Sequence, residues 1–216
     1  MADALRILVT GFEPFGGSPV NPSAMAAESL AHGRFPGTEV RALVLPVVGG
    51  TEPGSARAAL DAMLEAFPAD AAIHFGEAHV RGEVSVERVA VNLRDYRIAD
   101  NSGAFAEDSP VVADAADARF ATLPVRAIVD AVRAEGIPAG LSLSAGTYLC
   151  NEVMFHSLER AARGLAPAIS GFIHVPQLEA QHLLRPTDAR PITERELLAA
   201  ASAVLRTVAE HCRSRA

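Results

Sequence analysis

Short apolar runs alternate with amphipathic segments along almost the whole chain. Aliphatic and β-branched residues are concentrated at 5–10, 40–47, 71–75, 139–143 and 171–175, and helical patterns lie between these runs. Strands that alternate with helices form a mostly parallel sheet, because each crossover helix packs on a face of the sheet. The sequence therefore predicts an α/β fold with three layers, α/β/α, in which helices cover both faces of a twisted central sheet.

Helix start and stop signals refine this pattern. Asn21 and Pro22 suit the start of a helix that runs to about residue 32 and ends at Gly33. A second helix is expected after Thr51, and a Thr193–Glu196 capping box predicts a final helix of roughly twenty residues. Helices are also predicted at 123–135 and 149–162, a strand or hairpin at 83–93, and a long excursion without periodicity at 94–108.

Length and charge narrow the possible classes of protein. With 216 residues, half of them hydrophobic, the chain is expected to form a single domain over residues 1–216. The formal net charge is −7 and no basic run contains interleaved aromatic residues, which argues against nucleic-acid binding. All 19 basic residues are Arg, so Schiff-base chemistry and a P-loop lysine are excluded.

Targeting and cysteine signals point to a protein of the cytoplasm. The apolar run at 7–9 is too short for a signal peptide, and no run approaches the length of a membrane span. The two cysteines, Cys150 and Cys212, do not make a disulfide framework, and Cys212 is expected to be a structurally idle thiol. No metal-ligand spacing occurs among the Cys and His residues.

Cys150 is the candidate nucleophile. Three loops follow expected strands and should together form the site, namely 11–21, 76–81 and 144–149. Cys150 directly follows the third loop, where a helix is expected to begin. The free N–H groups and the dipole at a helix start favour negative charge, so a thiol there tends to ionise. The alternative is that this Cys is a small core residue.

A cysteine nucleophile needs a base and a group that orients the base. His174 lies near the end of the apolar run at 171–175 and is expected to project at the rim of the sheet. Glu87 lies in a strand-like segment, where a buried carboxylate needs a partner such as an imidazole N–H. Glu87 could instead pair with Arg88 or Arg97.

Four segments match the motifs of one family in order and spacing. They are VTGFEPFGG at 9–17 with Asn21-Pro22-Ser23, VERVAVN at 86–92 with Arg97 and Asp100-Asn101, SAGTYLCN at 144–151, and GFIHVP at 171–176. With these segments the chain resembles pyroglutamyl peptidase I, the pyrrolidone-carboxylate peptidases, a family of cysteine peptidases. Ordered co-occurrence of four motifs is far more specific than any one of them.

The resemblance implies a thiol triad. Cys150 matches the nucleophile, His174 the general base and Glu87 the residue that orients the histidine. The activity implied is removal of an N-terminal pyroglutamyl (5-oxoprolyl) residue from peptides, through a thioester acyl-enzyme. The resemblance also implies a single α/β/α domain, assembly into homotetramers, and no metal or organic cofactor.

The pocket is expected to suit an uncharged five-membered lactam. Such a ring needs a small apolar slot and a few backbone hydrogen bonds. Phe12 and Phe15 suit the ring faces, unless both pack under their loop as core. The backbone N–H of Cys150 and the Arg97 side chain are candidate donors to the oxyanion, although Arg97 is equally suited to pair with Asp100. The predicted substrate-binding set is completed by Glu77, Tyr148 and Leu149.

The chain departs from the family pattern in two places. The family usually has Gly-Gln-Ala-Gly-Gly-Arg, where the Gln helps to bind the lactam through its backbone, and this chain has GEAHVR at 76–81. Glu77 preserves a backbone contact, and His79 and Val80 make the loop bulkier. Tyr148 stands where Phe is usual, and its hydroxyl needs a partner if it is buried.

Two other functions remain open. A cysteine amidohydrolase of different acyl specificity, such as a glutaminase-like acyl transferase, would need a charged clamp for a free amino acid, and the Phe12 and Phe15 loop argues against it. A non-catalytic binding protein with the same fold would have no need for Cys, His and Glu together.

Overall fold

A mixed sheet runs through the centre of the molecule. The computed structural model describes residues 4–215, so residues 1–3 and 216 of the expected domain lie outside it. The sheet has six strands in the order β2-β1-β3-β8-β4-β7. They are β1 (Leu5–Phe12), β2 (Thr38–Leu45), β3 (Ala71–Glu77), β4 (Val84–Glu87), β7 (Ala139–Ser142) and β8 (Ile169–Val175).

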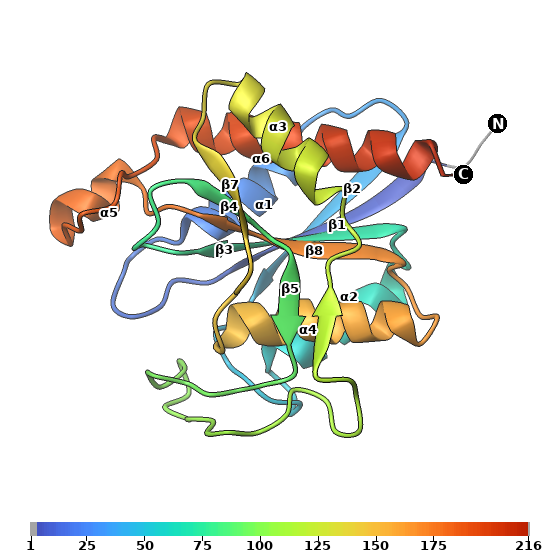
Figure 1. Ribbon diagram of the computed structural model, residues 1–216, viewed down its shortest axis with the longest axis vertical. Helices are drawn as coiled ribbons and strands as arrows, with labels where there is room; N and C mark the ends of the chain where they lie inside the picture. The colour runs from blue at the N-terminus through green and yellow to red at the C-terminus, as the bar shows by residue number, and fades with distance from the viewer. Residues whose placement is uncertain (1–3, 216) are drawn as a thin grey trace.

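Helices cover both faces of this sheet (Figure 1). One face carries α1 (Pro22–His32), α3 (Val125–Ala134) and α6 (Glu194–Arg213), and the other carries α2 (Ala56–Ala66) and α4 (Leu149–Ala162). Each face has its own cluster of buried apolar side chains between helix and sheet. The predicted three-layer α/β/α fold is therefore confirmed.

The strand directions reverse once across the sheet. β2, β1, β3 and β8 are parallel, whereas β4 is antiparallel to β8 and parallel to β7. Only residues 78–83 join β3 to β4, too few for the crossover that parallel strands need. The mostly parallel sheet is as predicted, and the reversal at β4 is the feature that periodicity did not indicate.

Alternation along β8 decides which side chains face α4. Ile173 and Val175 belong to the cluster under α1 and α6, and Phe172 belongs to the cluster under α4. Successive side chains of a strand point to opposite faces, so His174 faces α4 together with Phe172. The histidine and the helix that carries Cys150 are thus on the same side of the sheet.

The helix caps are largely those that the sequence indicated. Asn21 accepts a hydrogen bond from the amide of Ser23 at the start of α1, and Thr193 and Glu196 form the expected capping box of α6. The expected cap at Thr51 is wrong. Ser55 caps α2 instead, because residues 51–54 form a turn that delays the helix.

Three short elements complete the fold, and only the first of them lies in a segment, 83–93, where the sequence predicted a strand or hairpin. β5 (Val89–Val91) and β6 (Ala118–Phe120) form a separate two-stranded ribbon, and α5 (Glu179–Leu184) follows β8. Elements of three to six residues are too short to establish a period. No helix in the described part of the chain combines the length and the apolar character needed to cross a membrane.

Gly11 permits the close contact between β1 and α1, which suggests a stability test. A Cβ at residue 11 would lie 2.2 Å from the carbonyl oxygen of Ser23, a backbone atom that cannot move alone. We expect Gly11→Ala to lower the free energy of unfolding by about 3 kcal/mol, measured by urea denaturation. Gly136→Ala is the control, since Gly136 has φ 77° and open space, and should cost about 1 kcal/mol. Equal losses would contradict the proposed clash.

Candidate active site

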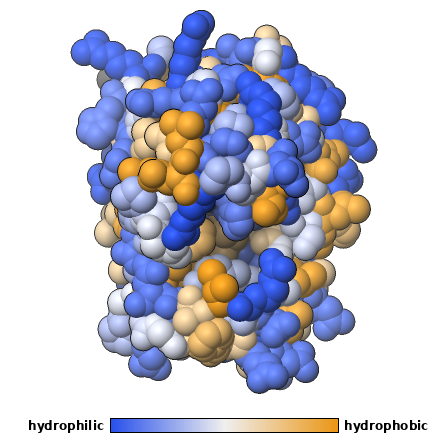
Figure 2. All heavy atoms as spheres, turned by 90° about the vertical axis from the view of Figure 1, so that its left-hand side faces the viewer, coloured by the Kyte–Doolittle hydropathy of each residue, from blue (hydrophilic) through white to orange (hydrophobic). Residues whose placement is uncertain are grey.

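The three loops expected to form the site meet at one cavity of about 530 Å³. Figure 2 shows this face of the molecule, with a hollow near its middle that is bordered by both polar and apolar side chains. The cavity is lined from the first loop by Phe12, Phe15 and Asn21, from the second by residues 77–81, and from the third by residues 145–149, together with Cys150, His174, Val47, Asp95, Arg97 and Ile98.

Cys150 lies in the first turn of α4, as the sequence predicted. Its Sγ reaches the backbone of Gly76, where a Cβ would lie 2.9 Å from the sulfur and 2.6 Å from the Phe172 ring. Gly76 is paired with His174 across β3 and β8. A side chain at residue 76 would therefore collide with both the sulfur and the Phe172 ring.

His174 and Glu87 form a buried pair. The His174 Nδ1 lies 2.7 Å from Glu87 Oε1, and both side chains are almost completely buried. Their contact follows from the antiparallel register, in which Ser85 opposes His174 and Glu87 is the diagonal neighbour. The reversal of β4 thus brings the carboxylate to the imidazole.

The protonation of the site differs from the expectation for a helix start. Burial raises the pKa of the Cys150 thiol to about 12, and the charge of Glu87 adds to this, while Arg81 opposes it. Burial also lowers the pKa of His174, against the hydrogen bond and charge of Glu87. A helix start favours the ionised form of a thiol, whereas burial of this thiol acts in the opposite direction. The sulfur needs a proton acceptor.

The partners of Glu87 are not those considered as alternatives. Arg81 Nη1 lies 2.5 Å from Glu87 Oε1, whereas no ion pair from Arg88 or Arg97 to Glu87 occurs among residues 4–215. Burial would raise the pKa of Glu87, but the hydrogen bond to His174 and the charge of Arg81 hold it below the ordinary value. Glu87 is thus a buried carboxylate that is bound by the Arg81 guanidinium and the His174 imidazole.

The predicted pocket residues all line the cavity, in different roles. Phe12 is buried and lies against the Phe172 ring, with ring centroids 6.4 Å apart, whereas Phe15 is half-buried. Both the core and the pocket-wall interpretation therefore hold for Phe12. Glu77 accepts a hydrogen bond of 3.0 Å from Gln181, and burial raises the pKa of its carboxyl.

Arg97 lines the cavity and is exposed. Its alternative role as a partner of Asp100 does not occur in the described chain, which has no ion pair between them. Asp100 instead accepts hydrogen bonds from Ser102 and from the amides of Gly49 and Ala104. The Arg97 guanidinium is left available to the cavity.

The excursion at 94–108 lies against the start of α4. The Tyr148 hydroxyl donates to the carbonyl of Ala99 at 3.2 Å, which supplies the partner that its replacement of Phe requires. Tyr148 also makes an edge-to-face contact with Tyr96, at 4.8 Å between ring centroids. Because Asp95, Arg97 and Ile98 line the cavity, the excursion forms one wall of the site.

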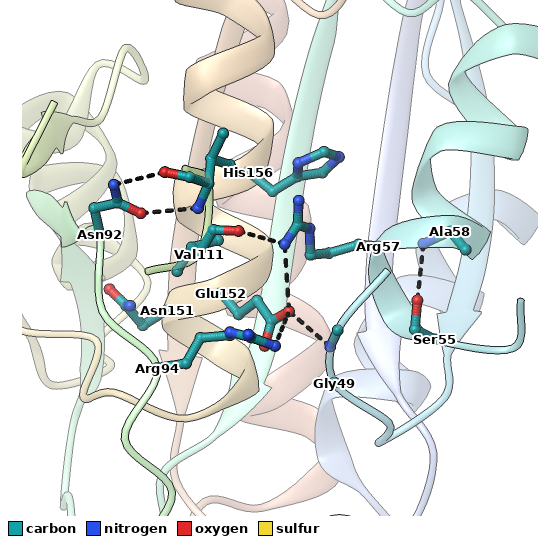
Figure 3. A network of polar contacts seen from close by, with 12 residues as sticks. Gly49, Ser55, Arg57, Ala58, Asn92, Arg94, Val111, Asn151, Glu152 and His156 are labelled. Atoms are coloured by element: carbon teal, nitrogen blue, oxygen red, sulfur yellow. Dashed lines mark hydrogen bonds and ion pairs between the residues drawn. The ribbon is translucent and has the colours of Figure 1, made fainter. Parts of the chain in front are cut away.

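A buried carboxylate on α4 anchors this wall (Figure 3). Glu152 is buried two residues after Cys150 and accepts hydrogen bonds from the Tyr96 hydroxyl and the Gly50 amide. Its carboxylate also lies 3.8 Å from Arg57 and 4.0 Å from Arg94. This network was not foreseen, since nothing in the sequence relates residues 57, 94 and 152.

Arg81 and residues 145–147 lie in loops that were expected to form the site, but the sequence assigned them no role. An Arg six positions before a Glu carries no signal by itself, and small residues in a turn point to backbone geometry only. In the described part of the chain, no group of three or more His, Cys, Asp or Glu side chains is arranged to hold a metal ion.

Comparison with known proteins decides the family. The family model described as pyroglutamyl peptidase matches residues 5–211. The chain belongs to the pyroglutamyl peptidase family. The resemblance drawn from the four motifs is therefore confirmed, and with it the predicted enzyme class, a cysteine omega peptidase.

Relatives and solved structures agree with this membership. The chain is 46% identical over 177 residues to the pyrrolidone-carboxylate peptidase of Pyrococcus furiosus, covering 82% of this chain and 83% of the relative. It is 45% identical over 180 residues to that of Chromobacterium violaceum, covering 83% and 81%. A crystal structure of pyrrolidone carboxyl peptidase from Pyrococcus furiosus superposes with a TM-score of 0.90 at 39% identity, covering 96% of this chain and 100% of that structure.

The two cysteines should differ in reactivity. Cys150 lines the same cavity as His174, whereas Cys212 is buried on α6. We expect iodoacetamide at neutral pH to modify Cys150 well before Cys212, measured by peptide mass spectrometry. His174→Ala should slow the modification of Cys150, because burial raises the pKa of this thiol and the proton then lacks an acceptor. Equal rates at the two cysteines would argue against an activated thiol.

Proposed function

We propose that this chain hydrolyses the amide bond that follows an N-terminal pyroglutamyl residue of peptides, with Cys150, His174 and Glu87 as its catalytic triad. The observation that carries the proposal is the buried pair of His174 and Glu87, 2.7 Å apart, in the same cavity as Cys150. Family membership supports the activity, and the geometry supports these residues for it.

The chemistry is an acyl transfer in two steps. His174 takes the thiol proton of Cys150 while Sγ bonds to the pyroglutamyl carbonyl carbon. The C–N bond then breaks, and the imidazolium gives the proton to the departing amine, which leaves a thioester. In the second step His174 takes a proton from water, the hydroxyl oxygen attacks the thioester carbon, and the sulfur leaves with that proton.

Glu87 determines which nitrogen of His174 accepts and donates the proton. Since Nδ1 is bonded to Glu87, Nε2 is the nitrogen left for the sulfur and the leaving amine. The carboxylate also stabilises the imidazolium that forms during each step, and burial makes this interaction stronger than it would be in water. Glu87 therefore orients the base and supports its charged form.

The oxyanion has two candidate donors. The amide of Cys150 lies in the first turn of α4, where backbone N–H groups have no partner within the helix. Arg97, which is exposed in the cavity wall, can supply a second, cationic donor. Both would act on the carbonyl oxygen as it gains charge.

The remaining cavity residues suit a neutral lactam. Phe12, Phe15, Tyr148 and Leu149 supply an apolar surface, and Glu77 lies beside them at the end of β3. The carboxyl of Glu77 has its pKa raised by burial, so it carries less negative charge than an exposed Glu at the same pH. These residues form our proposed substrate-binding set.

Further expectations rest on the family resemblance and belong to the proposal. We propose a single catalytic domain, a homotetrameric assembly and a location in the cytoplasm. Pyroglutamylated peptides are the proposed partners, with no metal or organic cofactor, no nucleic acid and no membrane.

The activity is tested with a chromogenic pyroglutamyl amide. We expect wild-type protein to release the chromophore, Cys150→Ala and His174→Ala to lose turnover, and Glu87→Gln to retain a small part of it, since misplacing an imidazole is less severe than removing it. Ammonia release from glutamine is measured in parallel. Ammonia without chromophore would favour an amidohydrolase of different acyl specificity, and neither product would favour a binding protein.

The pH profile tests the role of Glu87. The hydrogen bond and charge of Glu87 raise the pKa of His174 against the lowering effect of burial. In Glu87→Gln the pKa of His174 falls, so the acid limb of kcat/KM should move to lower pH. Glu83→Gln, at an exposed residue before β4, is the matched control and should leave the limb in place. A limb that moves to higher pH in Glu87→Gln would contradict this role.

A further inference from the structure

Arg81 makes two hydrogen bonds that join separate parts of the site. It lies in the loop between β3 and β4, and its Nη1 is 2.5 Å from Glu87 Oε1. Its Nη2 is 2.7 Å from the backbone carbonyl of Ser144. One guanidinium thus links the orienting carboxylate to the turn that precedes Cys150.

The contact on Glu87 is shared with the histidine. Arg81 Nη1 and His174 Nδ1 both bind Glu87 Oε1, at 2.5 and 2.7 Å. The Glu87 side chain has no exposed surface, so a single neutral donor would leave its charge poorly compensated. The Arg81 side chain is only 28% exposed, which places this cation partly out of water as well.

The second contact acts on the position of the nucleophile. Ser144 begins the turn at 144–148 that leads into α4, and the Ser144 hydroxyl accepts a hydrogen bond from the Gly146 amide at 3.2 Å. A displacement of this turn would move the first residues of the helix and the sulfur with them. A shift of about 1 Å in a reacting atom can cost on the order of a hundredfold in rate.

We infer that Arg81 is a positioning residue for the reaction, which holds the Glu87 carboxylate against His174 and fixes the turn that carries Cys150 into the cavity. The inference rests on the proposed function for its role in turnover. Arg81 does not need to touch the substrate in this role. Its single side chain keeps the base and the nucleophile aligned.

The charge of Arg81 adds an electrostatic effect of known sign. The charged groups that act on the pKa values of the sulfur and the imidazole are Glu87 on β4, Glu77 on β3 and Arg81 itself, and His79, Asp95 and Arg97 also line the cavity. Burial and Glu87 raise the pKa of Cys150, and Arg81 lowers it. Burial and Arg81 lower the pKa of His174, and Glu87 raises it. Removal of Arg81 should therefore raise both pKa values.

A lysine cannot reproduce this arrangement. The guanidinium presents two donors in a fixed plane, which suits a carboxylate on one side and a carbonyl on the other. The lysine ammonium is a point charge at the end of a flexible chain, so it preserves the sign of the charge but not both directions. Arg81→Lys and Arg81→Met therefore separate alignment from charge.

The first measurement is turnover of a pyroglutamyl amide as a function of pH. We expect Arg81→Met to lower kcat by roughly ten- to a hundredfold, the range typical of outer-shell groups that orient metal-ligating histidines, with KM nearly unchanged. Its acid limb should move to higher pH, opposite to the shift of Glu87→Gln. Arg81→Lys should have a lower kcat than wild type, with the acid limb of its pH profile at the wild-type position. Arg126→Met, which removes an exposed Arg on α3, should match wild type.

The second measurement needs no substrate. The rate at which iodoacetamide modifies Cys150 should be lower in Arg81→Met than in Arg126→Met at the same pH, because the thiolate has lost a nearby cation. If wild type cleaves no pyroglutamyl amide, the proposed function fails and this rate still tests Arg81. The inference would be overturned if Arg81→Met left the modification rate of Cys150 and the acid limb of the pH profile unchanged, or if it affected KM alone.

Discussion

A buried negative charge at the end of β4 connects the parts of the candidate active site. Glu87 has no exposed surface, and burial would raise the pKa of its carboxyl if His174 and Arg81 did not bind it. Because each partner comes from a different segment, the carboxylate remains charged only when β8 and the β3–β4 loop are both in place. The imidazole is therefore oriented only in the folded protein, and its orientation is as stable as the sheet itself.

A second buried carboxylate, Glu152, holds another segment in place near Cys150. It lies on α4 two residues after Cys150 and binds Tyr96, Arg57 and Arg94. These contacts fix the segment at 94–108 against the helix, so that a stretch with no periodicity forms a wall of the cavity. Cys150 thus lies between two ionic centres, and both are buried in an otherwise apolar core.

Much of the site was predictable because the relevant signals are local. Neighbouring residues are enough to recognise a histidine near the end of a strand, a thiol at a helix start and three loops that follow strands. The structure brings these features to one cavity. The protonation of Cys150 was not predictable in this way. Burial raises the pKa of this thiol, and its burial is set by every segment that covers the sulfur.

The sequence by itself determined the alternation of strands and helices, the caps of α1 and α6, and the residue types available as nucleophile, base and acid. These follow from hydrophobic periodicity and from the preferences of a few residues, which act over one or two turns of chain. Only the tertiary structure decided that β4 runs against β8, that Arg81 binds Glu87, and that Glu152 holds residues 94–108. Those contacts join residues whose spacing in the chain has no period, so they exist only once the sheet has been assembled.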